Sequence, residues 1–155
     1  MENTTQINGL YSRDETLYIL QYEDISGYDE YRRWQYKVKN YITPIDLSTP
    51  AEPELGATIN IPGVFLGLND AGTVLYTRTS EYDEKYNWHQ TLNVLELKED
   101  KAVLATALDL GQTYADIVIE DTTIVVTDNN YDWYYYDDMV YEGDAAVGIK
   151  SSDME

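Results

Sequence analysis

Three residues near the C-terminus have the spacing of a calcium loop. Asp128, Asn130 and Asp132 place an oxygen ligand at every second position, and Ca²⁺ takes about six to eight such ligands. Trp133 stands where such a loop expects glycine, and Met139 stands where it expects a bidentate glutamate. Calcium is therefore the single cofactor that the residue pattern raises as a candidate.

Other chemistry has little support in the residue types. His89 is the one histidine, and no Gly-x-Ser-x-Gly nucleophile turn occurs in the chain. One histidine and no cysteine exclude a zinc site made of these ligands. Carboxylates are plentiful, and two of them about 5–10 Å apart can hydrolyse a glycosidic bond. We predict no catalytic residue, and carboxylate-dependent hydrolysis remains the alternative.

The aromatic residues offer chemistry of another kind, because 16 Tyr and 3 Trp accompany a single Phe. Tyrosine combines a large ring with a polar hydroxyl, which suits half-buried strands and binding surfaces better than a deep core. The alternatives are strand propensity and cross-strand packing of the rings. The predicted binding residues are Tyr28, Tyr31, Trp34, Tyr82, Tyr86, Trp88, Tyr131 and Trp133.

Charge and hydropathy exclude several partners. Asp and Glu number 29 against 10 Lys and Arg, which gives a formal net charge of −19. Such a field repels nucleic-acid backbones and anionic membrane surfaces, so we predict neither as a partner. No run approaches the roughly 20 apolar residues of a membrane span, and residues 1–5 do not resemble a signal peptide. Mimicry of nucleic acid and adaptation to high salt both remain compatible with the charge.

A repeated element positions the aromatic residues. The tripeptide Tyr-Asp-Glu begins at residue 28 and again at residue 82, and a tryptophan follows each copy at the same spacing, at Trp34 and Trp88. A degenerate third copy begins at Tyr131. Repetition at such a period is the signature of stacked supersecondary units. The predicted repeats span residues 5–63, 64–111 and 112–155, the last of them incomplete.

The residues that flank each tip match as well. Leu17 before the first tip corresponds to Leu75 before the second, and Ile45 and Leu95 follow the two tips. The first copy is longer by four residues on each side of its tip. A hairpin lengthens in this way when both strands extend in register, so we predict a long protruding hairpin in the first repeat. In the third copy, residues 123–127 match residues 73–77, which places Val125 at the position of Leu75.

The pattern of each repeat predicts short antiparallel strands separated by turn-forming residues. In the second repeat we expect strands at residues 64–68, 73–79, 88–97 and 102–110. In the first, Trp34, Tyr36 and Val38 alternate with polar residues, which predicts a half-buried strand. Four antiparallel strands in this length are typical of a β-propeller blade. The predicted fold class is all-β, with about two and a half propeller-like blades; a small β-sandwich or another closed arrangement of three sheets is the alternative.

One segment resembles a known family. It reads Ile45-Asp46-Leu47-Ser48-Thr49-Pro50-Ala51-Glu52-Pro53-Glu54-Leu55. It resembles the turn between the third and fourth strands in secreted prokaryotic β-propeller repeats, including the LVIVD type. The resemblance implies a blade fold and an extracellular or cell-surface location. Residues 95–101 of the second repeat have lost both prolines, which departs from the family pattern without changing the period.

These patterns predict a non-catalytic binding or scaffold module of a secreted or cell-surface protein. Its ligand would be protein or carbohydrate, recognised through the Tyr- and Trp-rich hairpin tips. The alternative is part of a carboxylate-dependent hydrolase built on a propeller. An incomplete set of blades leaves strand edges and sheet faces uncovered. We therefore expect either further blades of a longer chain or a homo-oligomer.

Overall fold

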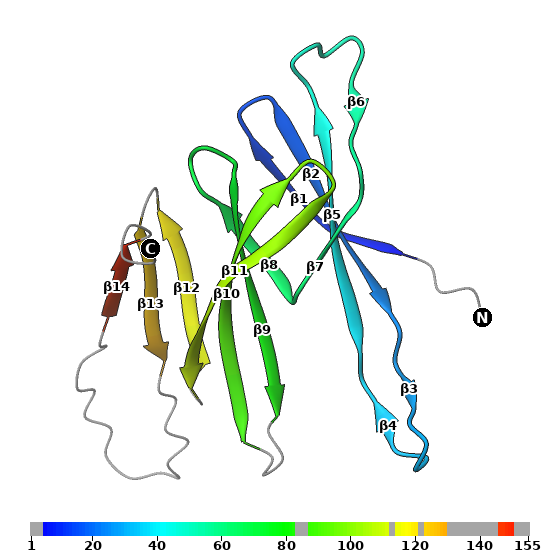
Figure 1. The fold of residues 1–155 in the computed structure, drawn as a ribbon, viewed down its shortest axis with the longest axis vertical. Helices are drawn as coiled ribbons and strands as arrows, with labels where there is room; N and C mark the ends of the chain where they lie inside the picture. The colour runs from blue at the N-terminus through cyan, green and yellow to red at the C-terminus, as the bar shows by residue number, and fades with distance from the viewer. Residues whose placement is uncertain (1–4, 83–86, 112–113, 121–122, 130–145, 151–155) are drawn as a thin grey trace, which may run out of the picture.

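The structure is a computed structural model that describes residues 5–82, 87–111, 114–120, 123–129 and 146–150. Within these ranges the chain forms antiparallel strands and no helix. Three larger sheets follow one another along the sequence, and Figure 1 shows them side by side. The prediction of an all-β, antiparallel fold is confirmed.

The first sheet is built around β5, which pairs with β2 on one side and with both β6 and β7 on the other. β1 adds to the free edge of β2. Beyond β2 and β5 the chain continues as the short hairpin β3–β4. The bounds are β1 Gln6–Arg13, β2 Thr16–Asp24, β3 Gly27–Tyr28, β4 Trp34–Gln35, β5 Val38–Asp46, β6 Glu54–Leu55 and β7 Ile59–Ile61.

The second sheet is a four-stranded meander in the order β8–β9–β10–β11. All four strands expected for this part of the chain are present. Their bounds are β8 Val64–Leu68, β9 Val74–Tyr82, β10 Trp88–Lys98 and β11 Lys101–Gly111. The third sheet has the order β12–β13–β14. Its strands are β12 Tyr114–Glu120, β13 Thr123–Asn129 and β14 Ala146–Lys150.

The first two sheets share a pairing register at the residues that the sequence comparison matched. Leu17 lies opposite Ile45 in the first sheet. Leu75 lies opposite Leu95 in the second. Towards the tips, Tyr28 pairs with Trp34 and Tyr82 with Trp88. Both strands of the first hairpin are therefore longer by equal amounts, and Figure 1 shows β3–β4 extending beyond β2 and β5.

Two apolar clusters join the three sheets. The first lies between the first and second sheets and includes Tyr18, Ile42, Leu75 and Leu95. The second lies between the second and third sheets and includes Tyr76, Leu92, Val94 and Ile124. Because successive side chains on a strand point to opposite faces, Leu75 and Tyr76 contribute to different clusters. The second sheet is thus covered on both faces, as its place in the middle of Figure 1 indicates.

The match between the second and third repeats agrees with the strand pairing but not with the face that is buried. Leu75 packs toward the preceding sheet, whereas Val125, its predicted counterpart, is absent from the cluster that joins the third sheet to the second. Ile124 packs there instead, opposite Ile119. The pairing register is nevertheless the same in both hairpins, because Leu68 pairs with Leu75 and Val118 pairs with Val125. The third sheet therefore turns its opposite face towards the preceding sheet, and Ile124 is buried there in the place expected for Val125.

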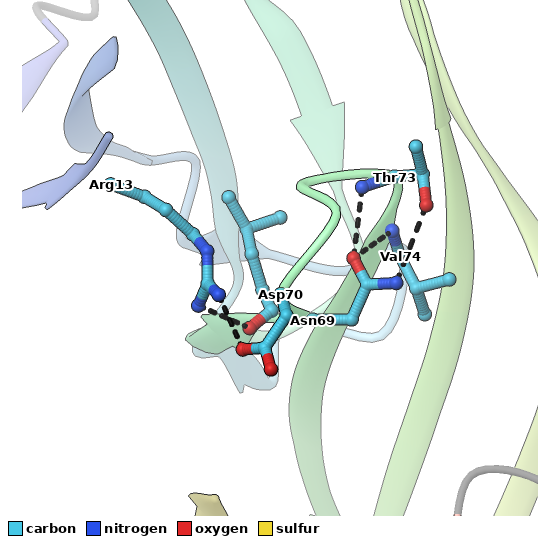
Figure 2. A network of polar contacts seen from close by, with 6 residues as sticks. Arg13, Asn69, Asp70, Thr73 and Val74 are labelled. Atoms are coloured by element: carbon cyan, nitrogen blue, oxygen red, sulfur yellow. Dashed lines mark hydrogen bonds and ion pairs between the residues drawn. The ribbon is translucent and has the colours of Figure 1, made fainter. Parts of the chain in front are cut away.

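A polar contact ties the first sheet to the second (Figure 2). Arg13, at the end of β1, pairs with Asp70 in the turn between β8 and β9. A second guanidinium nitrogen, Nη1, donates to the carbonyl oxygen of Leu68 at 3.4 Å. The turn itself is held by Asn69, whose Oδ1 accepts hydrogen bonds from the backbone N–H groups of Thr73 and Val74, each at 2.9 Å. This turn chemistry is typical of asparagine.

Candidate binding surface

The tip of the β3–β4 hairpin carries a pair of aromatic rings. Tyr28 and Trp34 lie opposite each other, with their ring centroids 5.1 Å apart in an edge-to-face arrangement. Their exposed fractions are 72% and 59%. The second hairpin repeats this pair, because Tyr82 and Trp88 meet edge to face at 5.0 Å. Tyr82 is exposed and Trp88 is half-buried.

The first tip is held in one conformation by Asp29. Its Oδ1 accepts hydrogen bonds from the backbone N–H groups of Tyr31 at 2.9 Å and Arg33 at 2.8 Å. Its Oδ2 accepts from Arg33 Nε at 2.9 Å and from Gln35 Nε2 at 3.3 Å. Arg32 has a φ of 59°, the left-handed conformation that turns the chain back into β4. One carboxylate thus fixes the loop that joins Tyr28 to Trp34.

The same contacts shift the ionisation of Asp29. Its pKa is lowered chiefly by the hydrogen bond from the backbone of Arg33, with further help from the Arg33 side chain and the backbone of Tyr31. Partial desolvation opposes this shift without reversing it. Hydrogen bonds to a carboxylate favour its charged form. The loop is therefore held by a carboxylate that stays ionised at neutral pH.

Two more exposed aromatic side chains flank this pair. Tyr31 at the tip is 71% exposed and Tyr36 beside β4 is 76% exposed. The guanidinium carbon of Arg33 lies 5.2 Å from the Tyr31 ring centroid, within the range of a cation–π contact. The prediction of a half-buried strand with Trp34 and Tyr36 on its covered side is wrong. The hairpin extends beyond the facing sheet, so nothing in the described structure covers those rings.

The return half of the first hairpin is the most basic stretch of the chain. Four of the ten lysines and arginines fall within residues 32–39, a stretch that contains no aspartate or glutamate. All four side chains are exposed. They are Arg32, Arg33, Lys37 and Lys39. The other half of the hairpin carries the four acidic residues Glu23, Asp24, Asp29 and Glu30. The hairpin as a whole is therefore close to neutral, in a protein whose net charge is −19.

The other predicted site residues are only partly placed. Tyr86, Tyr131, Trp133, Asn130 and Asp132 lie outside the described residues. Asp128 belongs to β13 by its backbone, and its side chain is also outside the described part. Among the residues that are described, no group of three metal-ligating side chains converges. The calcium site therefore stays a prediction. On the aromatic surface, Tyr36 is an exposed ring that the prediction from the sequence did not include.

A separate, concave feature of the structure is acidic rather than aromatic. A cleft of about 950 Å³ opens between the turn ends of the first and second sheets. The carboxylates that line it belong to Asp14, Glu15, Asp46, Glu54 and Glu99. The pKa of Asp46 is lowered by hydrogen bonds from Ser48, with the backbone N–H at 2.8 Å. A general acid for glycoside hydrolysis requires a raised pKa, so Asp46 does not suit that role.

His89 does not contribute to this cleft. Its Nδ1 lies 3.9 Å from Asp109 Oδ1, a contact that becomes an ion pair when the imidazole is protonated. The residues that line the cleft come from other strands and turns. The one histidine and the acidic cleft therefore do not form a shared catalytic centre.

Comparisons with protein-family models, curated proteins and solved structures find no match to this chain. Within the described ranges, no helix has the length and apolar character needed to cross a membrane.

Proposed function

We propose that this chain is a non-catalytic binding module with propeller-like stacked sheets, which recognises protein or carbohydrate through the aromatic surface of its first hairpin. This surface comprises Tyr28, Tyr31, Trp34 and Tyr36. The observation that carries the proposal is that four exposed rings stand on a hairpin whose tip, residues 29–33, is ordered by Asp29. Preordered aromatic side chains bind with a small loss of entropy.

The arrangement of the sheets supports the repeat architecture within this proposal. Three antiparallel sheets stack face to face through two apolar clusters. The segment that resembles a secreted β-propeller repeat connects β5 to β6, where Asp46 pairs with Glu54. That is the position expected for a turn between the third and fourth strands of a blade. The family, and with it an extracellular or cell-surface location, remains part of the proposal.

The charges of the hairpin bear on the charge of the ligand. Four basic residues follow the tip in the sequence and four acidic residues precede it or lie on it: Arg32, Arg33, Lys37, Lys39, Glu23, Asp24, Asp29 and Glu30. Because these charges balance, we expect a neutral ligand to bind about as tightly as its acidic analogue. Salt, which screens exposed charges, should therefore change this affinity little.

The test measures binding to two panels, one of neutral and acidic polysaccharides and one of neutral and acidic peptides. The change of Tyr28, Tyr31 and Trp34 together to Ala is expected to remove binding to whichever panel responds. The matched control is Leu104→Ala, because Leu104 is an exposed apolar residue on β11, away from the tip. Circular dichroism and urea unfolding check that the variants remain folded. Unchanged binding by the folded triple variant would contradict the proposal.

A further inference from the structure

One face of the first sheet is apolar and has no cover among the described residues. Alternation along the strands places Leu10, Leu17, Ile19, Ile45 and Leu55 on the face opposite to Tyr18 and Ile42. None of these five belongs to the apolar cluster beneath the sheet. Leu10 and Leu55 are 65% and 71% exposed. A contiguous exposed apolar surface of this kind commonly marks an interaction site.

The pairing register makes these residues one continuous stripe. Leu17 lies opposite Ile45, and Ile45 lies opposite Leu55 on its other side. In the next row, Leu10 lies opposite Ile19. Residues directly opposite on neighbouring strands have adjacent side chains. The stripe therefore crosses the sheet from β1 to β6 without interruption by a charged residue.

The second sheet shows what covers the equivalent stripe. Leu75 and Leu95 form the pair that corresponds to Leu17 and Ile45. They are 0% and 1% exposed, because the first sheet packs on them. The same pair is thus sealed by a neighbouring sheet in one repeat and left open in the other. The partner that fits the open stripe is another antiparallel sheet with an apolar face.

The third sheet offers such a face at the other end of the stack. Val118 lies opposite Val125, and neither belongs to the cluster that joins this sheet to the second. Val118 is exposed. These two valines therefore point away from the second sheet. On the first and second sheets, the corresponding face carries Tyr18 and Tyr76, each of which packs on the sheet that follows along the chain. Asp116 lies on the same face, two residues before Val118. Apart from this carboxylate at its border, the described part of the outer face is apolar, as is the open stripe at the opposite side of the stack.

We propose that two copies of this chain associate head to tail, with the outer face of β12–β13 in one copy packed on the Leu10–Leu55 stripe of the other. Such contacts use two different surfaces, so they close a ring or continue as a chain of copies. This inference is independent of the hairpin tip and of its ligand.

Charge sets the conditions for this association. Each copy carries a formal charge of −19, and like charges repel until salt screens them over about 10 Å at 0.1 M. Apolar contacts are not weakened by such screening. Association should therefore strengthen as salt rises.

The test is the molar mass of the full chain by light scattering on a size-exclusion column, at low and high salt and at concentrations up to about 0.5 mM. We expect a mass above the 17.8 kDa of one chain that rises with salt. It should be a discrete multiple if the contacts close a ring, and should grow with concentration if they continue as a chain of copies. Leu10→Glu with Leu55→Glu should give monomers, and so should Val118→Glu. Leu104→Glu, which replaces an exposed residue of the second sheet, should leave the mass unchanged.

Mixing the two variants distinguishes a head-to-tail contact from a symmetric contact, in which both copies would use the same face. The first-sheet variant keeps an intact β12–β13 face, and Val118→Glu keeps an intact stripe, so their mixture should recover the paired mass. Circular dichroism of each variant confirms that it is folded. The proposal would be overturned if the unmodified chain stayed monomeric at high salt. It would also be overturned if either variant still associated by itself, or if mixing the two variants gave no increase in mass.

Discussion

Trp34 and Tyr28 contact each other edge to face at 5.1 Å, yet both rings remain largely open to solvent. Their contact depends on the pairing of β3 with β4 and not on a core beneath them. An aromatic pair on an open hairpin contributes little to stability. The pair is therefore better suited to meeting a ligand than to holding the fold.

A double-mutant cycle measures how little this contact adds to stability. Tyr28→Ala and Trp34→Ala should each lower the free energy of unfolding by less than about 1 kcal/mol, with a coupling near 0.5 kcal/mol. Urea unfolding followed by circular dichroism gives these values. A loss above about 2 kcal/mol for either change would show that the tip supports the fold, and would weaken its assignment as a binding surface.

Asp29 should titrate below the ordinary aspartate value of about 3.9. Because its folded pKa is lowered, its contribution to loop order is complete above that value and is lost as pH falls through the lower folded pKa. The order of residues 29–33 should thus be constant from neutral pH down to about pH 5. An NMR titration of the Asp29 carboxyl carbon provides the measurement.

The matched variant for this titration is Asp29→Asn. It keeps the shape of the side chain but removes the charge, so it should loosen the loop at neutral pH and abolish the change in loop order below pH 4. The amide resonances of Tyr31 and Arg33, which bond to Asp29, report the effect. A midpoint above the ordinary value would contradict the lowered pKa.

The equivalent leucines of the first two sheets should differ in their contribution to stability. Leu75 is fully buried between the sheets, so Leu75→Ala should cost about 3 kcal/mol through lost contacts and a cavity. Leu17 is half-buried on the open face, and Leu17→Ala should cost about 1 kcal/mol in dilute solution. Urea unfolding of both variants at low micromolar concentration tests this contrast. Equal losses would mean that the open face is covered even in the monomer.

Gly63 should not tolerate a side chain, since it joins the first sheet to the second at a close backbone approach. Its φ is +69°, and an added Cβ would lie 2.1 Å from the carbonyl oxygen of Arg78. Gly63→Ala should therefore lower stability by more than about 2 kcal/mol. Gly72 is the control, because its φ is +66° but its Cβ would meet open space. Gly72→Ala should cost about 1 kcal/mol, and thermal unfolding compares the two.

Local patterns in the sequence determined the hairpins of this protein. The Tyr and Trp markers with Leu17, Ile45, Leu75 and Leu95 predict which residues pair. They do so because a hairpin is a short-range structure and its register follows from the distance of each residue to the tip. The equal extension of the two strands of the first hairpin was predictable for the same reason.

Only the tertiary structure decided which faces are covered. Alternation alone cannot tell whether a neighbouring sheet lies over a strand, so Trp34 and Tyr36 were expected on a half-buried strand although they are exposed. The third sheet turns its other face towards the second sheet, so Ile124 is buried where Val125 was expected, although Val118 and Val125 pair as Leu68 and Leu75 do. The open stripe of the first sheet and the role of Asp29 likewise depend on contacts in space, which residue spacing along the chain does not encode.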